Sequence, residues 1–307
     1  MTEFSVSKQI QGVTITMSAG KLAQLADGAV VVTIGDTQVL TTATAKRTMR
    51  DGADFFPLTV DVEERMYAVG RIPGSFFRRE GRATERATLT CRLLDRPLRP
   101  SFIDGFRNET HIVTTVLSAD LENPYDIAAL NGASAALSTS PIPFLGPIGG
   151  VRLALRDGEW VAFPTYEDLE ASVFDLVVAG KRNGAGDIDI AMVEAGATEH
   201  GYRHFKAGQV PSNEETITEG LEAAPEEIEW PVAVEYSPEM FTKVEAIAKS
   251  KLEAMGVVAD KHERQAQESA IRDDVLESLG LEDDEIREAK NAFGKVQKNV
   301  MRARVVA

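Results

Sequence analysis

The chain has 307 residues, 43% hydrophobic and 26% charged, a balance typical of a globular protein long enough for two domains. Its single cysteine, Cys91, excludes a disulfide framework within the chain, which fits a reducing, cytoplasmic location. The first twenty residues lack the basic start and apolar run of a secretory signal. No uninterrupted apolar run approaches the roughly 18 residues of a membrane-spanning helix, so we expect no membrane partner.

The formal net charge is −15, which taken alone argues against nucleic acid as a partner because phosphates repel an acidic surface. The charge is unevenly distributed, however. Residues 65–107 hold ten arginines and four acids, whereas residues 214–307 hold 22 acids and 12 bases. No lysine occurs between Lys46 and Lys181, and arginine suits bidentate phosphate contacts and stacking on bases. We expect about half of these ten arginines to be structural, paired with nearby acids.

The N-terminal part predicts strands joined by tight turns. Alternating residues predict strands at 13–17, 29–34, 37–44 and 56–62, the second and third forming a hairpin around Gly35-Asp36. Glycine and proline make residues 70–81 loop-like. From Thr84 the spacing turns helical, and Pro97 and Pro100 are expected to close that helix.

Further elements follow in the same mixed order. A strand is predicted at 112–117, a helix dense in alanine and glycine at 125–137, and a hairpin of 151–155 and 160–163 around Asp157-Gly158. Strands at 176–179 and 188–193 complete this part. We therefore expect a mixed α/β domain over residues 1–212.

After about residue 211 the composition becomes acidic and helical. Ser237-Pro238 is typical of an N-cap followed by proline at the first helical position. Two more amphipathic helices are predicted at 260–279 and 283–304, the last with an apolar stripe formed by Ile286, Ala289, Phe293, Val296 and Val300. Residues 213–307 therefore predict a small all-α domain.

The strongest functional candidate is the loop at residues 70–82, GRIPGSFFRREGR. Aromatic rings offer stacking surfaces for unpaired bases and guanidinium groups hold phosphates, so this pattern predicts contact with single-stranded RNA. The candidate residues are Phe76, Phe77, Arg78, Arg79 and Arg82. The alternative is that Phe76 and Phe77 are core anchors and only the arginines face solvent.

Other candidates are weaker. His200 and His204 stand four apart, as metal ligands on a helix can, but no third ligand has a suitable spacing. Asp187 and Asp189 alternate in a predicted strand and could act as paired acids, although a solvated strand end is the simpler interpretation. Phosphate-binding P-loop, nucleophile-elbow and Cys-x-x-Cys motifs are absent from the sequence.

Several segments together resemble the first half of the bacterial polynucleotide phosphorylase (polyribonucleotide nucleotidyltransferase) family, in an actinobacterial form. They are residues 54–60 (DFFPLTV), the 70–82 loop, residues 92–100 (RLLDRPLRP) and residues 132–137 (GASAAL). The resemblance implies an RNase PH-like core, a mixed α+β fold with a ribosomal-protein-type β-α-β unit, followed by the family's all-α linker domain. It also implies that the chain ends about where a second core would begin, as part of a longer protein.

The resemblance implies phosphorolytic 3′-to-5′ exoribonuclease activity in mRNA decay, with inorganic phosphate as co-substrate and Mg²⁺ as cofactor. In this family's catalytic core, Asp-x5-Asp-x-Lys precedes Val-Ala-Gly; here Leu169, Asp175 and Val177 precede Val178-Ala179-Gly180. The serine-rich phosphate turn is replaced by residues 123–126 (NPYD). We therefore expect no catalytic or metal-binding residue in this chain, and a Mg²⁺ site outside it.

The resemblance further implies a homotrimer, possible partners in an RNA-degradation complex, and a 70–82 loop at the neck of a central channel that grips RNA. Two alternatives stay open: an RNA-binding or structural module without enzymatic activity, and guanosine pentaphosphate synthesis, which actinobacterial relatives have been named for.

Overall fold

The computed structural model describes residues 3–49, 55–74, 76–183, 187–198, 236–255, 261–281 and 283–306. The chain divides into two compact units, Met1–Pro231 and Val232–Ala307. The domain boundary predicted at 212/213 falls within residues 199–235, outside the described residues. Within the described ranges, no helix is long and apolar enough to cross a membrane.

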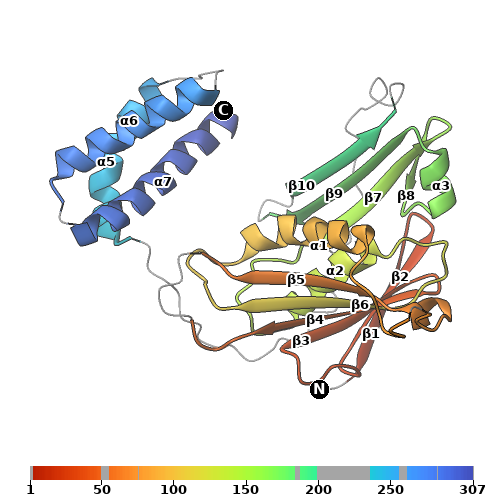
Figure 1. Ribbon diagram of the computed structural model, residues 1–307. Helices are drawn as coiled ribbons and strands as arrows, with labels where there is room; N and C mark the ends of the chain where they lie inside the picture. The colour runs from red at the N-terminus through yellow and green to blue at the C-terminus, as the bar shows by residue number, and fades with distance from the viewer. Residues whose placement is uncertain are drawn as a thin grey trace. The chain divides into compact units, whose positions relative to one another are not determined.

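The first unit contains a six-stranded sheet (Figure 1). Its strands, in spatial order, are β1 (Phe4–Ile10), β2 (Val13–Ala19), β3 (Gly28–Ile34), β4 (Thr37–Ala45), β6 (Thr110–Ser118) and β5 (Leu58–Glu64). All neighbours are antiparallel except β5 and β6. That parallel pair requires a crossover, which consists of the 3-10 helix η1 (Met66–Val69), the 70–82 loop, α1 (Glu85–Leu98) and η2 (Arg99–Ser101).

A second, four-stranded antiparallel sheet has the order β10 (Ile188–Ala197), β9 (Phe174–Arg182), β7 (Gly149–Arg156) and β8 (Glu159–Ala162). Helix α2 (Asp126–Ser138) packs against β3 and β4 of the first sheet and β7 of the second. All its residues but the last are buried, which explains why it is rich in alanine and apolar all round. A short helix, α3 (Tyr166–Ala171), follows β8.

Glycine allows the close approach of α2 to the first sheet. A Cβ on Gly28 of β3 would lie 2.0 Å from the carbonyl oxygen of Ala136, and one on Gly132 of α2 would lie 2.9 Å from Thr41 Oγ1. Both separations are too short for a side chain. The helix therefore sits directly on the strands.

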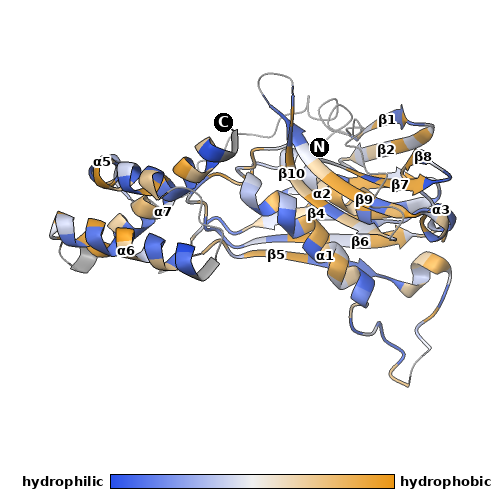
Figure 2. Cartoon of the chain, turned by 90° about the horizontal axis from the view of Figure 1, so that it is seen from above, coloured by the Kyte–Doolittle hydropathy of each residue, from blue (hydrophilic) through white to orange (hydrophobic). Residues whose placement is uncertain are grey.

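The second unit is a group of three helices, α5 (Pro238–Ala254), α6 (Lys261–Leu279) and α7 (Asp283–Val306). Ser237 Oγ caps α5 by accepting a hydrogen bond from the Met240 N–H at 3.1 Å, as predicted. The predicted stripe of α7 faces the core: four of its members are buried and Ile286 is half-buried. This unit has its own apolar core, separate from that of the first unit (Figure 2).

The mixed α/β unit followed by helices confirms the predicted fold class. Helix α1 ends at Leu98, between Pro97 and Pro100, as predicted. One detail was wrong. Strand β5 begins at Leu58, because Phe56 packs its ring on Phe102 at a centroid distance of 4.7 Å.

Candidate functional site

The 70–82 loop lies between η1 and α1, and Figure 2 shows this segment projecting away from the sheets, at the lower right. Both of its ends are fixed. The Met66 N–H donates to the Glu80 carboxylate at 3.0 Å, and Thr84 caps α1 by accepting from the Ala87 N–H at 3.0 Å. Among its described residues, 70–74 and 76–82, the loop contains neither helix nor strand, as predicted. It is therefore anchored at its neck and open at its tip.

The two aromatic rings at the tip are in solvent. Phe76 is 95% exposed and Phe77 is 77% exposed, with ring centroids 5.4 Å apart and planes nearly perpendicular at 86°. This exposure excludes the alternative in which the two rings are core anchors of this chain. Removing large apolar surface from water is favourable, so two bare rings on a tethered loop are suited to a stacking partner.

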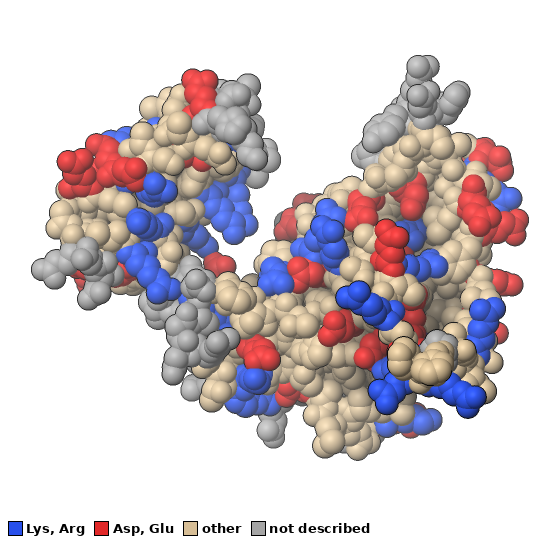
Figure 3. Space-filling model, viewed as in Figure 1, with Lys and Arg blue, Asp and Glu red and all other residues tan. Residues whose placement is uncertain are grey.

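Three arginines of the loop have no partner among the described residues. Arg78, Arg79 and Arg82 are exposed, and none has an ion pair or hydrogen bond within the part of the chain that the structure describes. In the view of Figure 3, blue Lys and Arg atoms surround the tan surface at the lower right of the first unit. The charge of these three side chains is therefore available to an anion.

Other arginines of the basic segment have structural contacts, as expected for about half of them. Arg96 pairs with Glu194 at 2.6 Å, Arg99 with Asp95 at 2.7 Å, and Arg65 with Glu63. Arg107 also has a partner. The Arg86 guanidinium carbon lies 4.4 Å from the ring centroid of Tyr166.

A groove of about 550 Å³ opens beside the neck of the loop. Its lining includes the end of β5, η1, residues 80–84 and the side chains of Arg86, Tyr125 and Tyr166. The Tyr125 hydroxyl donates to Glu64 Oε1 at 2.7 Å. Burial raises the pKa of Tyr125, and the neighbouring Glu64 carboxylate raises it further, so the hydroxyl stays a donor.

The sequence did not predict Arg86, Tyr125 or Tyr166 as residues of this groove. Tyr125 and Tyr166 are 41 residues apart, and no local motif connects them. The only signal was the arginine-rich composition of residues 65–107, which includes Arg86 but indicates nothing about the tyrosines.

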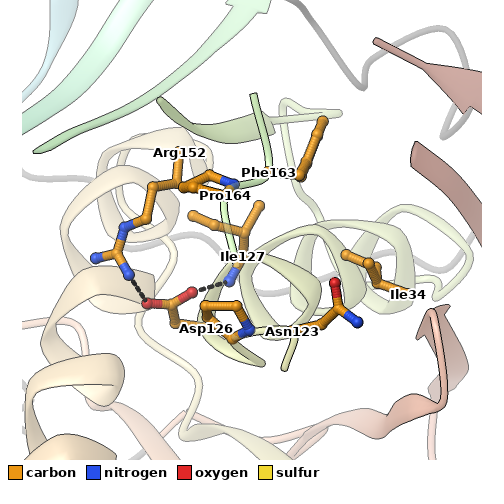
Figure 4. Close-up of a pocket in the computed structure, with 8 residues that line it drawn as sticks. Ile34, Asn123, Asp126, Ile127, Arg152, Phe163 and Pro164 are labelled. Atoms are coloured by element: carbon orange, nitrogen blue, oxygen red, sulfur yellow. Dashed lines mark hydrogen bonds and ion pairs between the residues drawn. The ribbon is translucent and has the colours of Figure 1, made fainter. Parts of the chain in front are cut away.

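Asp126 and Asp175, which belong to the two segments that differ from the family's catalytic pattern, both contact Arg152. Arg152 of β7 reaches Asp126 at the start of α2, with its Nη1 2.6 Å from Oδ2, and its Nε lies 3.2 Å from Asp175 Oδ1 of β9. Figure 4 shows the guanidinium of Arg152 directed at the Asp126 carboxylate, which also accepts from the Ile127 N–H at 2.8 Å. Leu169 lies in α3 and Val177 is buried in β9.

This arrangement leaves little room for a ligand. The cavity beside Asp126 and Arg152 measures about 10 Å³, roughly the space of a single water. Burial raises the pKa of Asp175, while the Arg152 charge opposes that change. These residues do not fit a divalent cation, because the guanidinium already occupies the position between the two carboxylates.

The weaker candidates gain no support. Asp187 and Asp189 are exposed at the start of β10, where Asp189 Oδ1 accepts from Asn183 Nδ2 at 3.0 Å, which fits a solvated strand end. His200 and His204 lie outside the described residues. Among the described ranges, no cluster of three or more His, Cys, Asp or Glu side chains could hold a metal ion.

Two family models match the chain. Residues 11–143 match the 3′ exoribonuclease family, domain 1, which covers strands β2 to β6 of the first sheet together with α1 and α2. The first unit is therefore an RNase PH-like core. Residues 239–307 match the RNA binding domain of polyribonucleotide nucleotidyltransferase, which covers the three-helix unit.

Curated relatives agree with this pairing of domains. A polyribonucleotide nucleotidyltransferase of Saccharopolyspora erythraea is 47% identical over 95% of this chain and 42% of its own length. Those of Salinispora arenicola and Thermobifida fusca are 46% and 45% identical, again over 95% of this chain, and over 40% and 41% of their own lengths. The chain belongs to the polyribonucleotide nucleotidyltransferase family, and it spans about two fifths of the length of these relatives.

Among solved structures, rice Rrp46 aligns with 68% of this chain and 88% of its own, at 15% identity and a TM-score of 0.47. That superposition is too loose to carry an inference.

Proposed function

We propose that this chain is the RNA-gripping, catalytically silent part of a phosphorolytic 3′-to-5′ exoribonuclease. The observation that carries the proposal is the exposure of Phe76 and Phe77 beside three arginines that have no partner in the described chain. Rings that stack on bases and guanidinium groups that hold phosphates bind single-stranded RNA with little dependence on sequence.

The proposed reaction takes place outside this chain. An oxygen of inorganic phosphate attacks the phosphorus of the 3′-terminal linkage, and the bond from that phosphorus to O3′ of the preceding nucleotide breaks. That O3′ takes up a proton and becomes the 3′-hydroxyl of the shortened RNA, and the terminal nucleotide is released as a nucleoside diphosphate. Such chemistry needs positive charge beside the transferring phosphoryl group, which Mg²⁺ supplies in this proposal. The cavity beside Asp126 and Arg152 measures about 10 Å³, too small for a phosphate, which supports a silent core.

We further propose a cytoplasmic homotrimer, in which three copies of the 70–82 loop surround one RNA strand at the neck of a channel. Three loops that bind the same strand would hold it with a higher overall affinity than one loop, because binding by one loop raises the local concentration of the strand for the others. Association with other RNA-degrading proteins would then supply substrate. Sedimentation of the full-length protein checks the trimer, and a monomer at micromolar concentration would contradict it.

The proposed lack of catalytic activity is tested by incubating this chain with poly(A), Mg²⁺ and phosphate and measuring phosphorolysis. We expect no release of ADP above the buffer control, together with measurable binding of a single-stranded oligonucleotide. Robust ADP release that depends on phosphate would overturn the claim of a silent core. If this chain neither cleaves nor binds RNA, the proposal that its 70–82 loop binds single-stranded RNA is wrong.

A further inference from the structure

The groove beside the neck of the loop has no role in the function proposed above. Its volume of about 550 Å³ lies within the roughly 300–1,000 Å³ of small-ligand sites. Glu80, Gly81 and Arg82 belong to both the loop and the groove lining. We propose that this groove binds one nucleotide unit, with its base stacked on Arg86 and its phosphate paired with Arg82. This inference rests on the proposed function, because its ligand, a nucleotide, belongs to the same chemical class as the proposed RNA substrate.

Arg86 is held as a stacking surface. Its guanidinium carbon lies 4.4 Å from the ring centroid of Tyr166 and 5.5 Å from that of Tyr125. Tyr125 is itself fixed, since it is only 5% exposed and its hydroxyl donates to Glu64. Arg86 remains exposed while lining the groove. A planar guanidinium supported from behind by an aromatic ring presents a flat, cationic face, which is the surface on which unstacked bases bind.

The charges of the groove match a nucleotide better than a simple anion. Each carboxylate already has a partner: Glu63 pairs with Arg65, Glu64 accepts from Tyr125 and Thr84, Glu80 accepts from the Met66 N–H, and Asp61 contacts His111. The lining holds four carboxylates and three arginines, a net charge of −1, which disfavours a simple anion. Arg82 has no partner within the described residues, so it is the cation free to meet a phosphate. Carboxylate oxygens keep lone pairs that can accept from ribose hydroxyls, as they do in dinucleotide sites.

The same chemistry has two possible sources. One is a free nucleoside diphosphate, the product class of the proposed reaction. The other is a nucleotide of the RNA strand that the loop holds. Both present a base, a ribose and a phosphate to Arg86 and Arg82, so the experiment must separate them.

The test titrates this chain with ADP by calorimetry and with a fluorescent ten-nucleotide oligo(A) by anisotropy. Arg86→Ala is compared with Arg92→Ala, which removes an equal charge from an exposed position of α1 outside the groove. We expect Arg86→Ala to weaken at least one probe by about tenfold, the value of one lost stack, and Arg92→Ala to change neither by more than about twofold. Tyr166→Phe keeps the ring and should bind like the parent chain.

The outcomes identify the source. Loss of ADP binding in Arg86→Ala assigns the groove to a free nucleotide, whereas loss confined to the oligonucleotide assigns it to the RNA strand. Equal affinities of Arg86→Ala and Arg92→Ala for both probes would overturn the proposal. Circular dichroism checks folding, and Arg86→Lys, which keeps the charge without the plane, provides a second variant with an intermediate loss. If only the proposed RNA contact of the loop is wrong, the combined variant Arg78→Ala and Arg79→Ala will bind the oligonucleotide as the parent chain does.

Discussion

Arg78 and Arg79 bring positive charge to an exposed tip in a protein of net charge −15. We expect Arg78→Ala combined with Arg79→Ala to weaken single-strand binding and to flatten its dependence on salt. Each phosphate contact to a single strand contributes a slope of about −0.7 in log K against log salt, so two lost contacts should reduce the slope by about 1.4. Filter binding at several salt concentrations measures this, with Arg92→Ala as the charge-matched control. An unchanged slope would exclude both residues as phosphate contacts.

Arg152 differs from the exposed arginines of the loop, because its side chain is only 17% exposed and lies between two carboxylates. Arg152→Met should lower the free energy of unfolding by about 3–5 kcal/mol, because it leaves Asp126 and Asp175 facing each other without a cation. Arg156→Met on the same strand is the control. The Arg156 side chain is 36% exposed where it pairs with Asp168, and solvent weakens such pairs, so its loss should destabilise the chain much less than the loss of Arg152. Urea titration compares them, and equal losses would refute a structural role specific to Arg152.

Asp120 links two turns through its carboxylate. Burial raises its pKa, but hydrogen bonds from Asn123, Glu122 and Thr37 outweigh this and lower the pKa to about 2. The same carboxylate accepts from the Asp36 N–H at 3.1 Å, beside Gly35, where any Cβ would meet Asn123 at 2.5 Å.

A group whose pKa is lower in the folded state stabilises the fold above its unfolded pKa, here about 3.8, and the stabilisation is lost as pH falls toward 2. Asp120→Asn should therefore destabilise the chain by about 1–3 kcal/mol at pH 7. The difference from the parent chain should shrink between pH 4 and pH 2. Urea unfolding at pH 7, 4 and 3 measures it, and a difference independent of pH would show that charge is not the cause.

At the scale of elements, the contact between β3 and α2 depends on a missing side chain. Gly28→Ala would place a Cβ 2.0 Å from the Ala136 carbonyl oxygen, a backbone atom that cannot rotate away. We expect a loss of about 1–3 kcal/mol or more in unfolding free energy. Gly196→Ala in β10 has nothing within 4 Å and should change stability by less than about 0.5 kcal/mol. Matched thermal melts distinguish the two, and equal melting temperatures would contradict this account of the packing.

Elements with local signals could be predicted from the sequence. The turn at Asp157-Gly158 has φ of 52° and 84°, the left-handed pair of a tight hairpin, and Asp-Gly is the dipeptide that adopts it. Ser237-Pro238 marked the start of α5, because serine caps helix N-termini and proline suits the first helical position. Pro97 and Pro100 likewise marked the end of α1, which lies at Leu98. Short elements were not predicted: η1 has four residues and α3 has six, too few for a helical period to appear.

The same distinction applies to the candidate site. The 70–82 loop is contiguous, so its rings and arginines could be recognised together, whereas their exposure required the structure. The contacts of Arg152 could not be predicted, because Asp126 is 26 positions away and reaches it through the packing of α2 on β7, whereas Asp175 is 23 positions away and reaches it through the pairing of β7 with β9. The resemblance indicated which charged residues are absent near Val178, and only the fold shows that Arg152 lies between Asp126 and Asp175.

On the scale of the whole molecule, the described residues form two apolar cores, one in each unit. We therefore expect that the stability of one unit can be altered without altering that of the other. Phe293 is 4% exposed in the core of the helical unit, and no residue of the first unit belongs to that core. Its truncation should affect the helices and leave the sheets intact.

Phe293→Ala should lower the stability of the helical unit by about 3–5 kcal/mol, since it opens a cavity in a small core. Trp160 reports on the first unit because its ring packs on Phe174 at 5.9 Å. In a Trp230→Phe background it is the only tryptophan of the chain. We expect helical ellipticity at 222 nm to be lost at lower urea in the variant, while the Trp160 fluorescence transition stays within about 0.3 M of the parent. Coincident shifts of both signals would mean that the two cores unfold as one cooperative unit, because separate cores lose stability separately.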